Sequence, residues 1–303
     1  MVEPVAFGFN AETAVNNYFQ LQDDVADNTV QQLALQEFIR MTEILRNKGI
    51  NVITVKDTEY PHTPDSIFPN NWISFHEDGR IVIYPMYAEN RRSERREDIP
   101  QLLEKSGYTI TYTIDYSKYE KENKYLEGTG SIVPDRVNKI AYAALSERTD
   151  EDLLNQFCKE FEYKPFAFHA YQTVNGKREP IYHTNVMMCV GDKYVVVCLD
   201  SVDDISECNA LERLFAESRK EIVCISEDQM HHFAGNMLQV RNQNGEAFLV
   251  MSQSAYNCLT DNQKKQLTSY NEIIPVAIPT IERYGGGSAR CMMAEIFLPQ
   301  ANF

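Results

Sequence analysis

The stretch from residue 183 to residue 226 reads HTNVMMCVGDKYVVVCLDSVDDISECNALERLFAESRKEIVCIS, and its pattern decides the fold. Two apolar runs flank Gly191 and Asp192, which is typical of a β-hairpin with a tight turn. The polar stretch 209–220 then has helical spacing, and 221–226 is β-rich. The sequence therefore predicts a unit of two strands, a helix and a third strand.

The same order of elements recurs along the chain. Three further hairpins are expected in NWISFHEDGRIVIYP (71–85), GSIVPDRVNKIAYAAL (130–145) and NMLQVRNQNGEAFLVMS (236–252). Each precedes a helical stretch and a β-rich one, namely 92–107 and 108–114, 149–161 and 163–172, and 260–270 and 272–278. A fifth helix and strand are expected in 31–49 and 50–55, and CMMAEIFLP (291–299) could supply the missing hairpin strands.

A unit split between the two ends would close a ring of five. Units of about 60 residues fall in the range of cyclic arrays and propellers. We therefore predict an α/β fold, a five-bladed α/β propeller of ββαβ-type units. No Pro/Gly/Ser-rich linker interrupts the pattern, so we expect residues 1–303 to form a single domain. The alternative is an open α+β sheet whose regular spacing is accidental.

Composition excludes several classes of function. The 44 Asp and Glu against 29 Lys and Arg give a net charge of −15, which repels nucleic acid and anionic membrane surfaces. Seven cysteines without a C-x-x-C pair suit a reducing compartment, the N-terminal stretch lacks the pattern of a secretory signal, and no apolar run could span a bilayer. We expect a cytoplasmic protein. Metal-binding and phosphate-binding motifs are absent from the sequence, so no cofactor is expected.

One position in each unit, just before the first hairpin strand, carries a polar or nucleophilic residue. These residues are Asp65, Glu127, His183, Asn236 and Cys291, separated by 53 to 62 residues. Equivalent positions of a closed array face one axis, so these side chains would converge. A thiol, an imidazole and carboxylates together are the set needed for nucleophilic catalysis at an electrophilic carbon.

Each of these residues also has a structural interpretation. Cys291 follows the glycine-rich stretch 285–287, whose backbone could approach a ligand, whereas the other six cysteines fit a core or a helix face. A lone histidine near a strand is more often structural than catalytic. The tract 90–96, NRRSERR, is most simply a solvated helix start. A non-catalytic amino-acid-binding module therefore stays an alternative, and a thiol redox protein a weaker one.

Five motifs in this order resemble the guanidino-group-modifying superfamily of arginine deiminases, amidinotransferases and dimethylarginine hydrolases. They are PDSIFPNNW (64–72), LEGTGS (126–131), HTN (183–185), FAGNML (233–238) and YGGGSARCM (284–292). The sequence is most similar to the citrulline-hydrolysing branch, often labelled amidinotransferase, over residues 60–297. The resemblance implies a five-bladed propeller with Cys291 as nucleophile, His183 as general acid and base, and Glu127 as its partner. Asp65 would hold the terminal N–H groups of the substrate.

Two departures from the superfamily pattern bear on the substrate. Superfamily members commonly carry a second acid two residues after the histidine, where this chain has Asn185, and an arginine before the first acid, where it has Pro64. A buried guanidinium lacking one anionic partner costs roughly 3–5 kcal/mol, whereas a neutral ureido group needs no such partner. Asp65 could accept its N–H groups and the Asn185 amide could donate to its oxygen.

We therefore expect a citrulline-like amino acid as substrate. Attack by a Cys291 thiolate beside a protonated His183 would give ornithine, carbon dioxide and ammonia. Arginine deiminase and amidinotransferase activities are the alternatives. Arg148, Phe68 and Asn71 are candidates for binding the α-amino and α-carboxyl ends of the substrate. The oligomeric state stays open, and a homo-oligomer is one candidate.

Overall fold

The predicted ββαβ unit is present in the computed structural model, which describes residues 1–23 and 25–300. Its first two strands pair antiparallel, and its third strand returns parallel to the second. The helix starts earlier than its apolar spacing predicts, because Asp204 accepts the backbone N–H groups of Ser206 and Glu207 and so caps it. The unit consists of β11 (Met188–Val190), β12 (Tyr194–Val197), α6 (Ile205–Glu217) and β13 (Glu221–Cys224).

Three further units repeat this topology, each with an antiparallel hairpin, a helix and a parallel third strand. The prediction of a mixed α/β fold made of repeated ββαβ units is confirmed. The elements are β3 (Ile73–Phe75), β4 (Arg80–Ile83), α2 (Asp98–Lys105) and β5 (Tyr112–Asp115); β6 (Val133–Asp135), β7 (Ile140–Ala144), α4 (Glu151–Phe161) and β8 (Lys164–Phe168); and β14 (Leu238–Arg241), β15 (Ala247–Ser252), α9 (Asp261–Thr268) and β16 (Glu272–Val276).

The fifth sector differs from the prediction. Helix α1 (Asp27–Asn47) is present, but the two-stranded sheet beside it pairs β1 (Val2–Glu3) with β2 (Val55–Lys56) in parallel. Within the described part of the chain, 291–300 forms no hairpin strands and contributes only an isolated bridge from Gln300 to Tyr108. Among the described residues no sheet closes on itself, so the five-bladed propeller stays a prediction.

Several shorter elements connect these units. A hairpin that was not predicted follows β8, formed by β9 (Tyr171–Val174) and β10 (Lys177–Pro180), and the predicted β-rich stretch 163–172 covers β8 and only the start of β9. The short helices are η1 (Pro69–Asn71), η2 (Asn90–Glu94), η3 (Ser117–Glu122), α3 (Gly128–Ser131), α5 (Thr184–Met187), η4 (Leu199–Ser201), α7 (Glu227–His231), α8 (Gln253–Cys258) and α10 (Pro279–Gly285). Among the described residues, no helix has both the length and the apolar composition needed to cross a bilayer.

The cysteines are free thiols, and three of the expected core cysteines are placed differently. Cys158, Cys189 and Cys198 are buried among apolar side chains. Cys224, however, is exposed at the end of β13, and Cys208 and Cys258 are only half buried. An amphipathic strand or helix has a solvated face, and apolar neighbours in sequence do not show on which face a cysteine lies.

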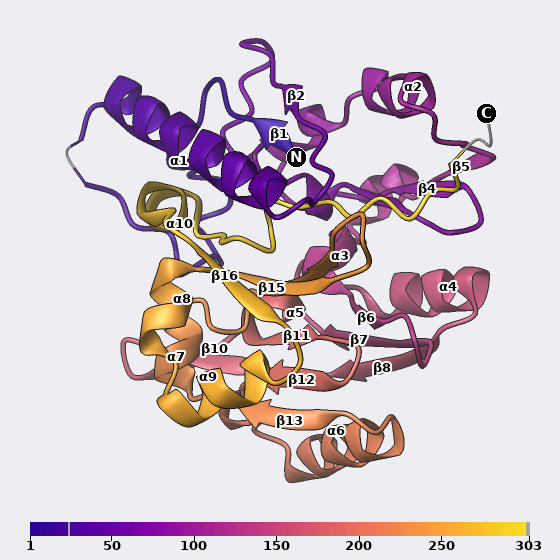
Figure 1. Ribbon diagram of the computed structural model, residues 1–303, viewed down its shortest axis with the longest axis vertical. Helices are drawn as coiled ribbons and strands as arrows, with labels where there is room; N and C mark the ends of the chain where they lie inside the picture. The colour runs from indigo at the N-terminus through magenta and orange to yellow at the C-terminus, as the bar shows by residue number, and fades with distance from the viewer. Residues whose placement is uncertain (24, 301–303) are drawn as a thin grey trace.

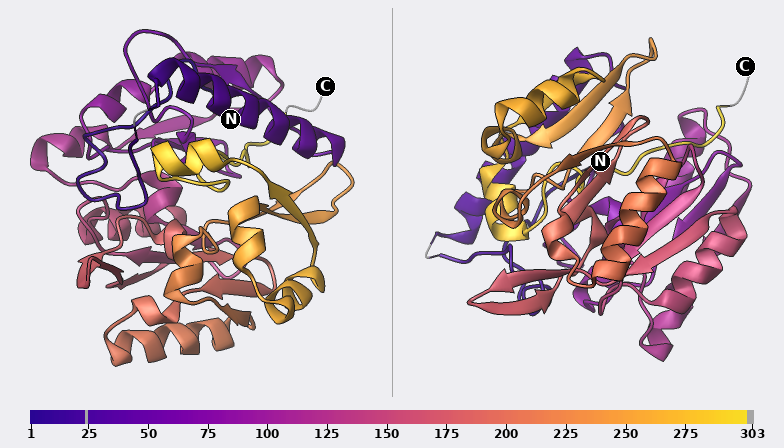
Figure 2. Two further views of the ribbon diagram at one scale, coloured as in Figure 1. Left: turned by 90° about the vertical axis from the view of Figure 1, so that its left-hand side faces the viewer. Right: turned by 90° about the horizontal axis from the view of Figure 1, so that it is seen from below.

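The short segments that begin each unit meet in the middle of the molecule and position the site. Figure 1 shows α3 and α5 near its centre and the longer helices α4 and α6 at its edge. In the left view of Figure 2, α1 lies across the same end of the molecule as α10, and these two helices are in contact. Gly128 adopts φ +48°, and a Cβ there would lie 2.3 Å from the carbonyl oxygen of Asn70. Only glycine allows α3 and η1 to approach this closely.

Candidate active site

His183 and Glu127 form a buried pair from two different units. Each residue immediately precedes a one-turn helix, α5 for His183 and α3 for Glu127, so the repeat brings them together. His183 Nε2 lies 2.7 Å from Glu127 Oε2, and both side chains are almost fully buried. Gly130 packs against the ring, and a Cβ there would lie 2.7 Å from His183 Nδ1. The imidazole is therefore held in one position.

Glu127 is ionised at neutral pH. Burial alone raises the pKa of this carboxyl group, but the Arg148 guanidinium and the hydrogen bond from His183 lower the pKa of Glu127 to about 2. Arg148 Nη1 lies 3.5 Å from Glu127 Oε2, and the backbone N–H of Tyr87 donates to Oε1 at 2.8 Å. An ionised carboxylate only accepts hydrogen bonds, so the proton in the pair lies on His183 Nε2.

His183 is a neutral base in the ligand-free site. Burial lowers the pKa of His183 to about 4, against the opposing effect of Glu127. With its proton on Nε2, the ring carries its lone pair on Nδ1. The protonated imidazole expected from the sequence is thus not the state that the structure favours, because burial outweighs the neighbouring carboxylate. The site presents a proton acceptor at Nδ1.

Cys291 follows α10, beyond the last of the four units, and is almost buried, at 4% exposure. Its Sγ lies 3.2 Å from Asn236 Nδ2 and 3.6 Å from Asn185 Nδ2. The amide orientation of Asn236 is fixed, because its Oδ1 accepts the backbone N–H of Arg290 at 3.1 Å and its Nδ2 also donates to the carbonyl oxygen of Asn185. An N–H group therefore faces the sulfur and would stabilise a thiolate.

The glycine-rich stretch before Cys291 has a packing role. Cβ atoms at Gly285 and Gly287 would lie 2.7 Å and 2.9 Å from the ring of Phe68. Gly286 adopts φ +61° and packs against Asn17. The sequence suggested that the backbone of these glycines could approach a ligand; in the structure Gly285 and Gly287 make room for the Phe68 ring beside the pocket.

Asp65 and Asn71 each have one buried polar atom without a partner. Asp65 Oδ2 accepts hydrogen bonds from Asn10 at 2.7 Å and from Thr13 at 3.1 Å, while Oδ1 has no partner. Asn71 Oδ1 accepts from Arg91 Nη1 at 2.9 Å, while Nδ2 has none. Because arginine only donates, this contact fixes the Asn71 amide with its N–H group directed away from Arg91. A free acceptor and a free donor are thus available to a ligand.

Arg91 is an important site residue that the sequence did not predict. The tract 90–96 was expected to be solvated, but Arg91 is only 2% exposed. Its Nε and Nη2 donate to the two carboxylate oxygens of Glu94, both at 2.9 Å, and its Nε lies 3.8 Å from Asp65 Oδ2. The sequence carries one signal of this ion pair, because Glu94 follows Arg91 by three residues, the spacing at which side chains meet on a helix. The guanidinium partly compensates the charge of Asp65.

We expect Arg91→Met to destabilise the protein by about 3–5 kcal/mol, because it leaves Glu94 buried without its cation. Burial already raises the pKa of Glu94 to about 7 even with Arg91 opposing it. Urea denaturation measures this loss in the free energy of unfolding. The matched control is Arg92→Met, at a neighbouring arginine that is 27% exposed and should contribute less than about 1 kcal/mol. Equal losses in the two variants would contradict the structural role of Arg91.

These residues enclose one small pocket, which we call the front pocket. Its volume is about 10 Å³, which leaves room for a single water molecule in the ligand-free protein. A substrate therefore needs more room than the front pocket offers in the ligand-free protein. The front pocket is lined by Thr13, Asn17, Asp65, Phe68, Asn71, Arg91, Arg148, Tyr182, His183, Gly285, Gly286, Gly287 and Cys291.

The structure brings together most of the residues selected from the sequence. Cys291, His183, Asp65, Phe68, Asn71 and Arg148 line the front pocket, and Glu127 lies behind His183. Arg148 is fully buried and donates to the carbonyl oxygen of Thr13 at 2.9 Å, so it braces the pocket wall. Asn185 does not line the front pocket but contacts the thiol from the other side. Among the described residues, no group of His, Cys, Asp and Glu side chains could hold a metal ion.

The fold matches structures of the guanidino-modifying enzyme superfamily, and comparison with known proteins specifies the family. The model of the family described as N,N dimethylarginine dimethylhydrolase, eukaryotic, matches residues 3–298. The chain belongs to this family. The superfamily suggested by the five sequence motifs is thereby confirmed. Comparison with curated proteins finds no match.

Solved structures of related folds are similar over nearly the whole chain. The apo structure of ArgZ, an arginine dihydrolase from the ornithine-ammonia cycle in cyanobacteria, superimposes with a TM-score of 0.71 at 16% identity, covering 98% of this chain and 40% of that one. A ternary complex of AgrE with ornithine and NAD+ has a TM-score of 0.71 at 17% identity, covering 100% and 39%. A dimethylarginine dimethylaminohydrolase adduct has a TM-score of 0.60 at 14% identity, covering 86% and 90%.

This chain thus spans about 40% of the full-length ArgZ and AgrE chains. It covers 98% of the separate N-terminal domain of ArgZ, which has been solved with a covalent reaction intermediate (TM-score 0.70, 16% identity, 99% of this chain). These neighbours bind small amino acids: arginine in one AgrE complex and ornithine in another. At these low sequence identities, the structural similarity shows that the fold is shared.

Proposed function

We propose that this protein is a cysteine-dependent hydrolase that cleaves the ureido C–N bond of a citrulline-like amino acid. One observation carries the proposal: a thiol and a neutral, carboxylate-bound imidazole line one buried pocket with an unpartnered donor and an unpartnered acceptor. The thiol and imidazole supply the nucleophile and the proton carrier. The free donor and acceptor match a ureido group, which has both a carbonyl oxygen and N–H groups.

The mechanism follows from the protonation states of these groups. His183 Nδ1 takes the thiol proton, and the resulting thiolate, beside the Asn236 N–H group, attacks the ureido carbon. The imidazolium, stabilised by Glu127, then protonates the leaving nitrogen, which releases ornithine and leaves a carbamoyl group on sulfur. His183 next deprotonates a water molecule that attacks this carbonyl carbon. The thiol is restored, and the carbamate released decomposes to carbon dioxide and ammonia.

The orientation of the Asn71 amide favours a ureido group over a guanidinium. A guanidinium has only hydrogen-bond donors, so it would leave Asn71 Nδ2 buried and unpaired, which costs about 1–3 kcal/mol. A ureido oxygen accepts from that group while its N–H groups donate to Asp65 Oδ1. Arg91, 3.8 Å from Asp65, further reduces the negative potential that a cationic substrate would need.

Asn71→Asp tests this choice of substrate. The aspartate keeps an acceptor for Arg91 but removes the N–H donor and adds a negative charge. We expect kcat/KM for citrulline to fall about 10²- to 10³-fold, since a donor to the reacting carbonyl is lost. The value for arginine should fall less or rise. Ornithine release from citrulline and ammonia release from arginine, measured on one preparation, give a ratio that does not depend on the folded fraction.

An arginine hydrolase or an amidinotransferase is the second candidate, and Asp65 is the observation that favours it. Its unpartnered Oδ1 could pair with a guanidinium, and AgrE, one of the similar structures, has been solved in complex with L-arginine. Assays of arginine and citrulline side by side, with and without an acceptor amine, separate these activities. An unchanged ratio of kcat/KM for citrulline to kcat/KM for arginine in Asn71→Asp would argue against the ureido assignment.

Several wider expectations belong to the same proposal. We infer that residues 1–303 act as one domain, since Asn10, Asn16 and Asn17 of the N-terminal segment bond to three different units. A five-bladed propeller is supported by the four repeated units around the central helices α3 and α5. The free thiols support a cytoplasmic location. A homo-oligomer stays a prediction.

A further inference from the structure

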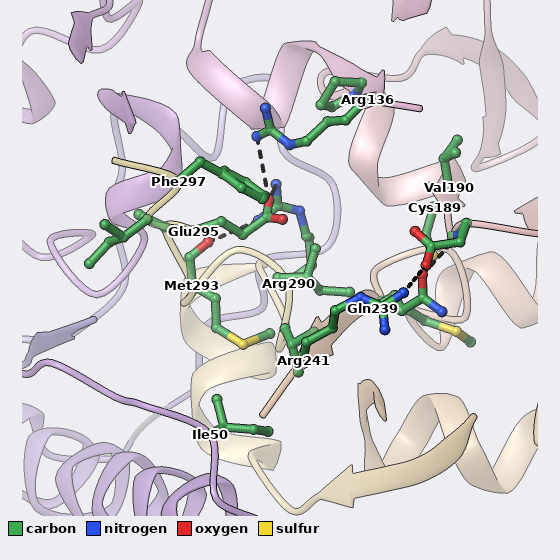
Figure 3. Close-up of a pocket in the computed structure, with 18 of the residues that line it drawn as sticks. Ile50, Arg136, Cys189, Val190, Gln239, Arg241, Arg290, Met293, Glu295 and Phe297 are labelled. Atoms are coloured by element: carbon green, nitrogen blue, oxygen red, sulfur yellow. Dashed lines mark hydrogen bonds and ion pairs between the residues drawn. The ribbon is translucent and has the colours of Figure 1, made fainter. Parts of the chain in front are cut away.

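A second and much larger cavity lies on the other side of Cys291. This rear cavity has a volume of about 990 Å³, against about 10 Å³ for the front pocket. It lies between β11, β14 and the C-terminal segment 293–300. Figure 3 shows Met293, Glu295 and Phe297 on one side of it and Cys189, Val190 and Gln239 on the other.

The rear cavity is open and has both polar and apolar walls, and its arginines are satisfied. Arg290 Nη2 lies 3.2 Å from Glu295 Oε2, and Arg136 lies over the ring of Phe297 at 3.9 Å. Arg241 pairs with Asp192. Each arginine that lines it in the described part of the chain has an anion or a ring to bind, so the cavity does not match an anionic ligand. The cavity suits small neutral molecules, and water above all.

Only a thin partition separates the rear cavity from the front pocket. Asn185 lines the rear cavity and Cys291 lines the front pocket, and Asn185 Nδ2 is 3.6 Å from Cys291 Sγ. The Asn185 side chain has no hydrogen-bond partner among the described residues other than this sulfur, at 3.6 Å and 4.0 Å. Asn236, by contrast, is fixed by two backbone groups. Asn185 is therefore the part of the partition that can rotate at little cost.

We propose that the rear cavity is the route by which water reaches the reacting carbon, past the side chain of Asn185. This proposal rests on the proposed hydrolase function. The amino-acid substrate fills a front pocket that holds only one water molecule when empty, so the front offers no path for the second step while ornithine is present. Water from the rear cavity gives its proton to His183 and its oxygen to the carbamoyl carbon. Cys291 leaves as the thiol, and the small products depart by the same route.

The test narrows the rear cavity with residues outside the catalytic machinery. Val190 on β11 and Val240 on β14 line the cavity and are half buried, so Val190→Trp/Val240→Trp places two indoles in it. The control is Val55→Trp/Val174→Trp, at two half-buried strand valines that do not line it. The first readout is the rate at which methyl methanethiosulfonate, a small neutral reagent, labels Cys291. Peptide mass spectrometry measures this rate with and without saturating ornithine.

We expect ornithine to leave wild-type labelling largely unchanged, and the double Trp variant to be labelled about tenfold more slowly than wild type or control. In turnover with citrulline, the same variant should cleave its first citrulline at the normal rate and then accumulate carbamoyl enzyme with ornithine still bound, seen by intact-protein mass spectrometry. Full protection by ornithine, or equal labelling of all three proteins, would overturn the proposal.

The labelling readout needs no turnover, so it separates this proposal from the hydrolase function. If citrulline is not hydrolysed but the Trp variant is labelled slowly, the route stands and the substrate assignment fails. If citrulline is hydrolysed and labelling is unaffected, the route fails alone. Thermal melting checks folding of the double variant, and the single variants Val190→Trp and Val240→Trp repeat the test should it unfold.

Discussion

Replacing Cys291 with serine should abolish ornithine release from citrulline, with a fall in kcat of at least about 10⁴-fold. A serine hydroxyl at neutral pH is a far weaker nucleophile than a thiolate, and the neutral His183 is a weak base for it. Because serine is slightly smaller and Cys291 is nearly buried beside two amides, the fold should be kept. The measurement is a ninhydrin or mass-spectrometric assay of ornithine.

The matched control is Cys224→Ser, since Cys224 is exposed on β13 and distant in the fold from the front pocket. Its activity should stay within about twofold of wild type. Iodoacetamide adds a second test, because a catalytic Cys291 should be alkylated with loss of activity, whereas burial raises the pKa of Cys158 to about 12 and keeps that thiol inert. Full activity of Cys291→Ser would overturn the assignment of Cys291 as the nucleophile.

Glu127→Gln should lower kcat by about 10³- to 10⁴-fold while the protein stays folded. The carboxylate holds the proton on His183 Nε2 and stabilises the imidazolium that forms during the reaction. Glutamine keeps the shape but removes the charge, so the imidazolium becomes less stable and Arg148 loses its anion. The effect therefore falls on the chemical step, with a smaller effect on KM.

The pH profile of kcat/KM gives a separate check of the same interaction. His183 must be neutral in the free enzyme, so activity should fall as the pH drops through about 4, the pKa of His183. Glu127 raises that pKa, hence Glu127→Gln should shift the acidic limb to lower pH, not higher. Glu147→Gln, at an exposed acid next to Arg148 in the chain, should leave both rate and profile unchanged. An acidic limb near pH 6.5 in wild type would show that burial does not control this histidine.

Most of the repeated fold could be predicted because its signals are local. The turn at Gly191 and Asp192, the helical spacing after it and the following β-rich run together specify β11, β12, α6 and β13 within 44 residues. The sector that contains α1, β1 and β2 could not be predicted in this way. Pairing of β1 with β2 joins residues 2–3 to 55–56, and such a short parallel contact leaves no periodic pattern in either segment.

The candidate site was predictable where one position recurs in every unit. Asp65, His183 and Cys291 were selected on that basis, and the structure places them in one pocket. Arg91 was missed because a run of arginines and acids is usually solvated, and only the tertiary fold shows that one of them is buried. The protonation state of His183 was also out of reach, since it depends on burial that no spacing reports.

The assembly of this pocket from four separate units has a consequence for biosynthesis. A ribosome makes the segments carrying Asp65, Glu127 and His183 well before it makes Cys291, so a product that stops before residue 291 lacks the proposed nucleophile. A nascent chain that has folded its earlier units would already carry the imidazole and the carboxylates. Such a chain could carry out the proposed hydrolysis only after residue 291 has joined the pocket.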